Sequence, residues 1–332
     1  MKGVILSQYN KNIIRAMLGL KVEERTLSKP GDNEVLIKIH AAPVNPSDIA
    51  FMQGGYNIVK TLPAVIGFEG AGTVEETGKN LKHLAGKKVS CFVQEDRDGT
   101  WAEYVITTVD NLLVIDDEME LDQAACFTVN PFTAYGLMNI ALMRESKAVM
   151  QNAASGQVGL FIRKMAHEKG LAVINIVRKE ETARMLRDEG EQYVFCETDD
   201  HFNEALCETA RQLQATTAFD AVGGNLAGIM FNAMPSDSEL VVYGGLSNKP
   251  AGGFDTMDLI FNDKIVSGFN LPEWKKELEQ SEFETVSRML QQKFMAGEYQ
   301  TKIQGKTPLQ DVVKGLRQYI GAMSRGKILL VP

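Results

Sequence analysis

Residues 148–159 read AVMQNAASGQVG, and this stretch decides the fold. Its start, AVMQNAA, predicts a buried β-strand, and the residues after Gly159 predict a helix that ends at Gly170. Small side chains at such a strand-to-helix turn let the backbone approach a pyrophosphate at the helix N-terminus. Alanine occupies the first glycine position of the G-x-G-x-x-G pattern, so the stretch alone also fits an ordinary tight turn.

The sequence around this turn alternates between strand and helix patterns. A helical stretch begins near Leu121, and the segments after the turn are LAVINIVR (171–178), the helix ETARMLRDE before Gly190, and the short strands YVF (193–195), FDAV (219–222) and LVVYGG (240–245). This alternation predicts βαβ units and a parallel sheet. We therefore expect an α/β domain over residues 121–265.

The sequence on both sides of this domain reads differently. Residues 1–120 are rich in short β patterns, and they indicate a small barrel or sandwich: EVLIKIHAA (34–42), AGTVEE (71–76), KKVSCFV (87–93) and WAEYVIT (101–107). Residues 266–332 predict helices over 274–296 and 308–323 and a last strand, KILLV, and we expect this tail to complete the first domain.

Length and composition fit a globular protein of two domains. The chain has 332 residues, of which 44% are hydrophobic and 23% charged. Its net charge is −8 and its basic residues are scattered, which argues against nucleic acid as a partner. The first residues, MKGVILSQYN, hold too short an apolar run for a signal peptide, and no long apolar run follows, so we expect a cytoplasmic protein without a membrane segment.

The end of the second strand carries information about the cofactor. A domain that binds NAD needs an acidic side chain there for the ribose hydroxyl, whereas this strand ends in Arg178. A guanidinium can bind the 2'-phosphate of NADPH, with help from Lys179 and with Asn175 nearby. The alternative is that Arg178 is merely a solvated residue at a strand end, beside Glu180 and Glu181.

The sequence offers no set of metal ligands. It has four histidines, and none lies near a cysteine in a ligand-like spacing. The four cysteines stand far apart, so we expect neither disulfides nor a structural zinc site. We expect hydride transfer without a metal.

Several motifs together resemble a known family. They are NPSD-x-x-x-x-Q-G-x-Y (45–56), LPAV-x-G-x-E-G (62–70), QNAASGQVG (151–159), NIVR (175–178), YGG (243–245) and GF-x-L-x-x-WKK (268–276). The chain resembles the mitochondrial-type 2-enoyl thioester reductases and the zinc-free quinone oxidoreductases of the medium-chain dehydrogenase/reductase superfamily. The resemblance implies a GroES-like β-rich catalytic domain, a doubly wound Rossmann-type domain, NADPH as cofactor, a small-molecule substrate and a homodimer.

The resemblance also assigns roles to residues of the first domain. Tyr56 matches the tyrosine that donates or organises the proton added at Cα of an enoyl substrate. A phenol stays protonated at neutral pH and can stabilise the enolate that hydride addition creates. Asn45 matches an asparagine beside the nicotinamide ribose, and we count it as catalytic and cofactor-binding. The alternatives are a half-buried loop aromatic for Tyr56 and a turn opener for Asn45.

The remaining predicted contacts lie in and after the turn. Thr133 matches a threonine at the cofactor, with Asn130 as a helper or a local cap. Trp274 resembles an aromatic residue of the substrate pocket, although a Trp that opens a helix is as often a packing anchor. The other expected cofactor contacts are Ala154, Ser155, Gly156, Gln157, Val158, Tyr243, Gly244, Gly245, Phe269 and Leu271.

These residues predict a zinc-independent, NADPH-dependent reductase of an activated carbon-carbon double bond or a quinone. A thioester substrate is not secured, because Asn57 follows the key tyrosine and no basic cluster suits an acyl carrier or coenzyme A. Quinone reduction is the first alternative, because a flat electron-poor ring needs little from Tyr56. The second is a protein that binds NADPH as a sensor or structural element, with weak catalysis.

Overall fold

The computed structural model describes residues 1–332, and these form two compact units. The first unit consists of residues 1–129 and 284–332, and the second of residues 130–283. These units divide later in the chain than the boundaries expected at 120 and 265. The short helix over Leu121–Ala124 packs on strands of the first unit, and the strand over Ile265–Gly268 pairs within the sheet of the second.

The first unit is built from antiparallel strands and short helices. Its strands are β1 (Lys2–Leu6), β2 (Lys21–Glu24), β3 (Glu34–Pro43), β4 (Ala64–Val65), β5 (Glu69–Thr77), β6 (Lys88–Phe92), β7 (Tyr104–Thr108), β8 (Leu112–Val114), β15 (Ile303–Pro308) and β16 (Lys327–Val331). Its helices are α1 (Ile13–Leu18), α2 (Pro46–Met52), α3 (Leu121–Ala124) and α12 (Val312–Gly321), with 3-10 turns η1 (Lys82–Leu84), η2 (Val109–Asn111), η3 (Leu309–Asp311) and η4 (Met323–Arg325).

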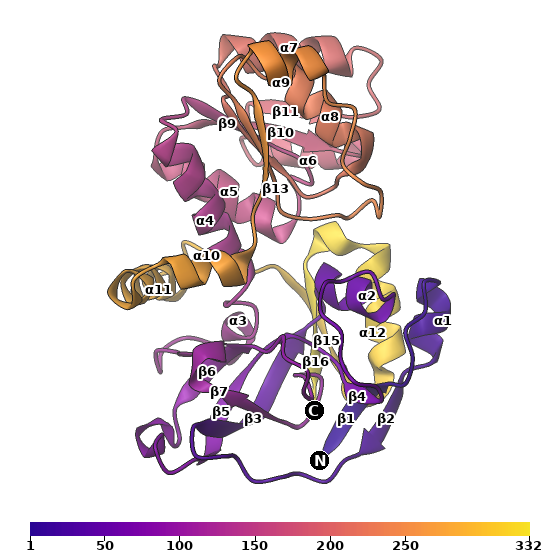
Figure 1. Cartoon of the computed structure of the whole chain (residues 1–332), viewed down its shortest axis with the longest axis vertical. Helices are drawn as coiled ribbons and strands as arrows, with labels where there is room; N and C mark the ends of the chain where they lie inside the picture. Colours follow the sequence, from indigo (N-terminus) through magenta and orange to yellow (C-terminus); the bar gives the residue numbers. More distant parts are fainter. The chain divides into compact units, whose positions relative to one another are not determined.

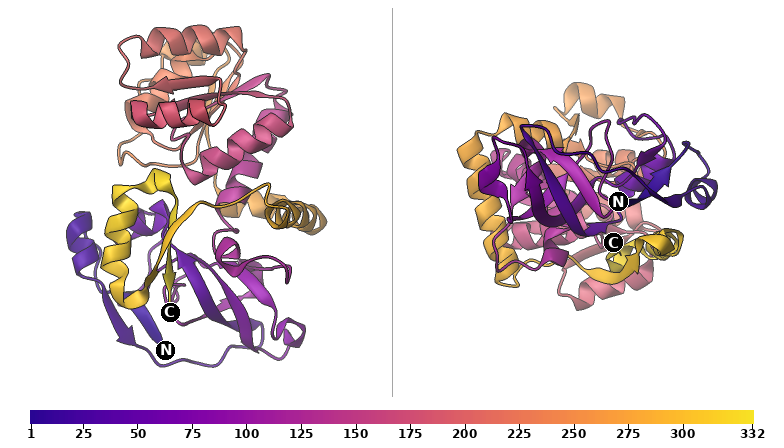
Figure 2. Two further views of the ribbon diagram at one scale, coloured as in Figure 1. Left: turned by 180° about the vertical axis from the view of Figure 1, so that it is seen from behind. Right: turned by 90° about the horizontal axis from the view of Figure 1, so that it is seen from below.

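The C-terminal segment completes the first unit, as expected from the sequence. Strand β16 pairs with β3 through Leu330 and Ala42, and β15 pairs with β16. Helix α12 packs on these two strands, and its Leu316 is fully buried. The two ends of the chain therefore lie close together within this unit (Figures 1 and 2).

The second unit is a parallel sheet between helices. Its strands are β9 (Ala148–Gln151), β10 (Ala172–Val177), β11 (Tyr193–Cys196), β12 (Thr217–Asp220), β13 (Glu239–Val242) and β14 (Ile265–Gly268). Its helices are α4 (Asn130–Met143), α5 (Gln157–Glu168), α6 (Glu180–Asp188), α7 (Phe202–Gln212), α8 (Gly224–Ala233), α9 (Thr256–Phe261) and α10 (Leu271–Glu277). Helix α11 (Gln280–Met295) crosses the boundary between the units.

The strand order of this sheet is β11-β10-β9-β12-β13-β14. This is the doubly wound order, in which the chain starts in the middle and the direction of winding reverses between β9 and β12. Helices α7 and α8 cover one face, while α5 and α6 pack against β10 from the other (Figure 1). The expected fold class, a β-rich GroES-like domain plus a Rossmann-type domain, is confirmed.

One predicted helix is two helices in the structure. The pattern over 274–296 suggested a single helix, but α10 begins at Leu271 and ends before Leu278, whose ψ of 139° is not helical. Asn270 caps the start of α10, because its side chain accepts a hydrogen bond from the backbone N–H of Glu273. Pro272 in the first turn favours the same starting point.

Candidate active site

The turn between β9 and α5 has the geometry of an anion site. Gly156 is the N-cap of α5, and no side chain caps the N–H groups of the first turn. Gly159 lies so close to the turn that a Cβ there would stand 2.6 Å from the carbonyl oxygen of Ala154. Ala153, which precedes Ala154 at the first glycine position, adopts a left-handed conformation with φ of 47°. A helix N-terminus whose N-cap is a glycine, without a capping side chain, fits a dinucleotide pyrophosphate.

Asn152 ties this turn to the neighbouring strand at the point where the winding reverses. Its Nδ2 donates to Oδ1 of Asp220 at 2.5 Å, and its Oδ1 accepts from the N–H of Ala221 at 2.8 Å. Asp220 also accepts from the N–H of Gly223. The carboxyl ends of β9 and β12 are therefore linked by buried side chains where ligands of this fold bind. Asn152 lies in the motif of the turn, but the sequence reasoning did not single it out.

The end of β10 leaves two cationic side chains available. Arg178 and Lys179 are exposed, and their side chains make no hydrogen bond or ion pair within the chain. The neighbouring carboxylate of Glu180 is engaged by Arg187 at 2.9 Å and by Arg184 at 3.5 Å. Of the two acidic residues close to Arg178 in the sequence, Glu180 is therefore paired with other arginines.

Asn175 has a different environment from Arg178. Its side chain is fully buried in β10, where it accepts a hydrogen bond from Gln151 at 2.8 Å and donates to Glu191 at 3.1 Å. These bonds occupy the amide inside the domain. The expected contact between Asn175 and a cofactor stays a prediction.

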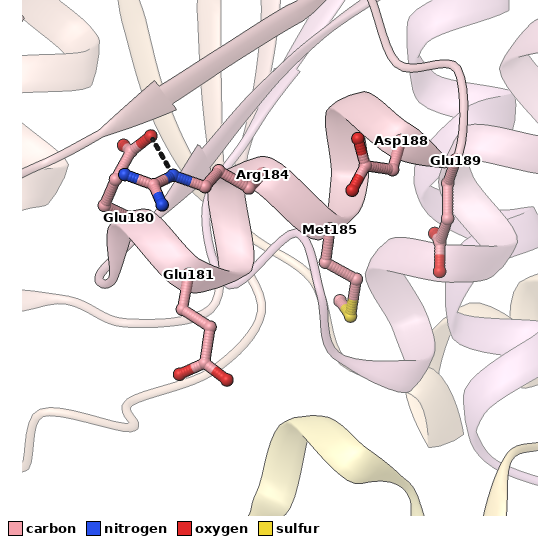
Figure 3. A pocket seen from close by; sticks show the side chains of 6 residues that line it. All are labelled: Glu180, Glu181, Arg184, Met185, Asp188 and Glu189. Carbon is pink, nitrogen blue, oxygen red and sulfur yellow. Dashed lines mark ion pairs between the residues drawn. The ribbon is translucent and has the colours of Figure 1, made fainter.

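The outer face of α6 carries a shallow hollow of about 520 Å³ (Figure 3). Its lining residues are Glu180, Glu181, Arg184, Met185, Asp188 and Glu189. Four of the six are carboxylates, and the one cation, Arg184, is paired with Glu180. Such a surface repels phosphate groups, so we do not place a nucleotide there.

Helix α4 and the segment after β14 pack closely together. A Cβ at Gly136 would lie 2.5 Å from the ring of Phe269 and 3.1 Å from that of Trp274. The Trp274 ring also lies 6.1 Å from that of Tyr135. Trp274 therefore packs against α4. Its contact with the substrate stays a prediction.

The first turn of α4 carries the two other candidates of this region. Asn130 and Thr133 are both buried, and the Nδ2 of Asn130 has no hydrogen-bond partner within the chain. A buried donor without a partner costs about 1–3 kcal/mol unless a ligand or water satisfies it. The side-chain amide of Asn130 can therefore donate a hydrogen bond to a bound ligand.

The segments after β13 and β14 hold five further candidates. The N–H of Tyr243 donates to the carbonyl of Asp220 at 2.9 Å, beside the Asn152 link. A Cβ at Gly244 would lie 2.8 Å from the carbonyl oxygen of Ala221, whereas Gly245 faces open space. Phe269 follows β14, and Leu271 is the first residue of α10. These residues all belong to the carboxyl edge of the sheet.

In the first unit, Tyr56 lies in the loop after α2. Its ring lies 5.5 Å from that of Phe68, and its hydroxyl oxygen accepts a hydrogen bond from Nε2 of Gln94 at 2.9 Å. Burial raises the pKa of Tyr56, the hydrogen bond from Gln94 lowers it, and the charge of Asp48 raises it. Because Gln94 is the donor, the phenolic proton remains available for another acceptor.

One buried and one exposed side-chain interaction hold the loop that carries Tyr56. Lys60, which is 2% exposed, donates to the carbonyl of Arg97 at 2.8 Å and lies over the ring of Phe68. Thr61 donates to the Asp96 carboxylate through its N–H at 2.6 Å and its hydroxyl at 2.7 Å. Residues 94–98 therefore fix the position of Tyr56 from across the fold. Neither Gln94 nor Lys60 lies in a motif or a spacing that identifies it from the sequence.

Asn45 belongs to a buried cluster of charged groups. Its Nδ2 donates to Glu69 at 2.9 Å, and Lys327 donates to its Oδ1. Its N–H donates to Asp48 at 2.7 Å. Burial raises the pKa of Asp48 to about 7 and also raises that of Glu69, although Lys327 opposes both shifts. Burial lowers the pKa of Lys327, but the charges of the groups around it, with Glu69 and Asp48 among them, raise that pKa above its usual value.

Two family models match this chain. The alcohol dehydrogenase GroES-like domain matches residues 31–117, and the zinc-binding dehydrogenase model matches residues 158–292.

The second model's description names a metal, and the residues of the Asn45 cluster do not fit one. The ammonium of Lys327 already interacts with the amide and carboxylates that a cation would need. No three His, Cys, Asp or Glu side chains in the chain are grouped to hold a metal ion.

Relatives of known name are similar over most of the chain. The mitochondrial enoyl-[acyl-carrier-protein] reductase of Xenopus tropicalis is 32% identical over 277 residues, which cover 82% of this chain and 78% of the relative. A Mesorhizobium loti structure, provisionally assigned as an NADPH:quinone reductase, is 30% identical with a TM-score of 0.93, covering 100% of this chain and 98% of that one. The mitochondrial 2-enoyl thioester reductase heterodimer of Candida tropicalis has the same fold, with a TM-score of 0.82 at 22% identity, covering 100% of this chain and 99% of that one. The chain therefore belongs to the medium-chain dehydrogenase/reductase superfamily, as an oxidoreductase of the group that includes the mitochondrial enoyl reductases and the quinone reductases.

Proposed function

We propose that this protein reduces an activated carbon-carbon double bond with NADPH, in an enoyl thioester, an enal or an enone. The observation that carries the proposal is the hydrogen bond from Gln94 to the oxygen of Tyr56. It leaves the phenol as a proton donor, and the raised pKa keeps that phenol protonated at neutral pH.

The nicotinamide, when bound, supplies the hydride for Cβ of the substrate. Tyr56 then donates a hydrogen bond to the carbonyl oxygen that gains enolate charge, and its proton goes to Cα directly or through water. The reduction therefore consumes one hydride and one proton for each double bond. Glu69 and Lys327 hold the Asn45 amide, which would contact the ribose beside the nicotinamide.

NADPH is the proposed cofactor because of the residues at two positions. The turn and the first residues of α5, with the backbone of Ala154, Ser155, Gly156, Gln157 and Val158, would bind the pyrophosphate. Arg178, with Lys179, would bind the 2'-phosphate, because both cations are unpaired. Further proposed contacts are Asn130, Thr133, Asn175, Tyr243, Gly244, Gly245, Phe269 and Leu271, with Trp274 at the substrate.

The decisive experiment follows NADPH oxidation with a trans-2-enoyl thioester, an enal and a quinone, for the wild type and for Tyr56→Phe. General acid catalysis contributes about 100- to 10,000-fold, so enoyl turnover by Tyr56→Phe should fall about 100-fold or more. Binding of NADPH should stay unchanged. Full enoyl turnover by Tyr56→Phe would overturn the role of Tyr56.

Quinone reduction is the second candidate, favoured by the name of the Mesorhizobium loti relative. A quinone takes up hydride with little help from a positioned proton. Turnover of quinone alone, with the same rate in Tyr56→Phe, would assign this chain to quinone reduction.

We also propose that the reaction needs no metal and that the protein forms a homodimer. Activity should survive dialysis against a chelator, because Lys327 occupies the place of a cation in the Asn45 cluster. Strand β14 is an open edge of its sheet; its first residue, Ile265, is 48% exposed, and Phe261, at the end of α9, is 72% exposed. Phe261→Lys should therefore shift a dimer towards monomer in light scattering.

No helix of the structure has the length and apolar character needed to span a bilayer. The curated relatives carry mitochondrial names, so the cytoplasmic location expected from the sequence stays a prediction.

A further inference from the structure

A buried arginine lies directly behind the turn between β9 and α5. The side chain of Arg163, on α5, is 4% exposed. Its Nη1 donates to the carbonyl oxygen of Ala154, its Nη2 contacts Glu189 at 3.0 Å, and its Nε contacts Glu191 at 2.9 Å. The guanidinium thus links the turn to the loop that precedes β11.

This contact fixes the direction of one peptide group in the turn. The peptide between Ala154 and Ser155 is planar, and in a trans peptide the C=O and N–H point in opposite directions. Because the carbonyl of Ala154 points to Arg163, the N–H of Ser155 points away from it. That N–H has no acceptor within the chain. Ser155 therefore presents a donor at the proposed pyrophosphate site.

Glu191 holds the arginine in place. Its carboxylate, 7% exposed, also accepts from Nδ2 of Asn175 at 3.1 Å and lies 3.4 Å from the exposed ring of His167. Asn175 in turn accepts from Gln151 at the end of β9. A continuous set of buried polar groups therefore joins β9, β10, α5 and the turn.

We propose that Arg163 is a positioning residue for the dinucleotide: it orients the Ala154–Ser155 peptide so that the Ser155 N–H faces the pyrophosphate. Arg163 does not touch the cofactor. The inference rests on the proposed function, because it assumes that a nicotinamide dinucleotide binds at this turn.

The test is Arg163→Met, which keeps an unbranched side chain that can stay buried and removes the donors and the charge. We expect the Kd for NADPH, measured by the fluorescence of the bound nicotinamide, to rise about 10-fold. The kcat at saturating NADPH should stay within about 2-fold, because the chemistry lies elsewhere. A 10-fold rise corresponds to about 1.4 kcal/mol.

The chain offers a matched control in the same unit. Arg144 also bonds a backbone carbonyl, that of Asp237, at 2.9 Å, and pairs with the carboxylates of Asp237 and Glu239. Arg144→Met should lower the melting temperature and leave the Kd for NADPH unchanged. An equal loss of affinity in both variants would overturn the inference, because stability alone would then explain it.

A double variant guards against a misfolded single variant. Arg163→Met with Glu191→Leu replaces the buried ion pair by apolar side chains, an exchange that often restores or improves stability. The melting temperature should recover while the affinity for NADPH stays low, because the Ala154 carbonyl still lacks the hydrogen bond from Arg163. Recovery of affinity together with stability would refute the positioning role.

The proposed function and this inference fail in distinguishable ways. A wild-type chain that does not bind NADPH would refute the proposed function and, with it, this inference. A wild-type chain that binds NADPH, beside an Arg163→Met variant that binds it equally well, would refute this inference alone.

Discussion

Gln94→Leu tests whether the phenol of Tyr56 is oriented by its neighbour. In the structure Nε2 of Gln94 donates to the Tyr56 oxygen at 2.9 Å, and both side chains are half-buried. Leucine keeps much of the volume and removes the donor. The phenol can then rotate, so that its proton is no longer aimed at the substrate in most molecules.

The magnitude follows from the kind of bond that is lost. A neutral side-chain hydrogen bond contributes about 0.5–1.5 kcal/mol net, which corresponds to about a 2- to 12-fold loss in kcat for enoyl reduction. The measurement is a double-mutant cycle of kcat with Tyr56→Phe, assayed by NADPH oxidation with an enoyl substrate. In the Tyr56→Phe background, Gln94→Leu should have no further effect, because no phenol remains to be oriented.

Gln304→Leu is the matched control for this cycle. Its amide also donates at 2.9 Å in the first unit, but to the backbone carbonyl of Gly326. This variant should leave kcat unchanged in both backgrounds. The orientation argument is wrong if Gln94→Leu costs the same with and without the Tyr56 hydroxyl.

The other predictions concern the cofactor side and the Tyr56 loop. Arg178→Ala should raise the KM for NADPH about 10- to 100-fold and leave the KM for NADH unchanged, since a charge-assisted hydrogen bond contributes about 1.5–3 kcal/mol. Steady-state assays with both cofactors check this, and an equal rise in both KM values would contradict it. Gly159→Ala places a Cβ 2.6 Å from the Ala154 carbonyl, so it should displace the turn and weaken NADPH binding in the same fluorescence titration; unchanged affinity would count against the turn as the binding site. Burial lowers the pKa of Lys60 to about 8, although the charge of Asp98 opposes the shift. Between pH 8 and the usual pKa of lysine, the folded state therefore binds fewer protons than the unfolded state. Relative to Lys60→Met, the wild type should therefore gain stability as pH rises through that window, by at most about 3 kcal/mol in urea unfolding, and a gain on acidification would refute the assignment.

The sequence predicted the elements whose signals are local. The strand and turn at 148–159 have a strand pattern, a run of small residues and a helix pattern in immediate succession, and the structure has β9, the turn and α5 there. Arg178 could be placed at the end of β10 because a strand end follows from the same pattern. These features depend on neighbours within a few residues.

The contacts that adjust the site depend on the tertiary fold. Gln94 reaches Tyr56 across 38 positions, and Lys327 reaches Asn45 across 282. Neither pair has a spacing that a periodicity can reveal, because the register of β3, β5, β6 and β16 brings them together. Asn175 shows the opposite difficulty: it is close to Arg178 in sequence, but the alternation of the strand directs its amide into the domain.

In both units a buried cation bonds a protein group that lies in, or next to, a proposed contact with the cofactor. Lys327 holds the Asn45 amide, and Arg163 holds the Ala154 carbonyl, each with two carboxylates nearby. Burying such charges is costly, and apolar replacements of similar volume are often as stable or more so. Stability alone therefore does not explain why two such clusters are present. A buried cation with several fixed partners can hold one amide or carbonyl in a single direction, which an apolar contact cannot do. Substitutions at these two positions should accordingly separate cofactor affinity from folding stability.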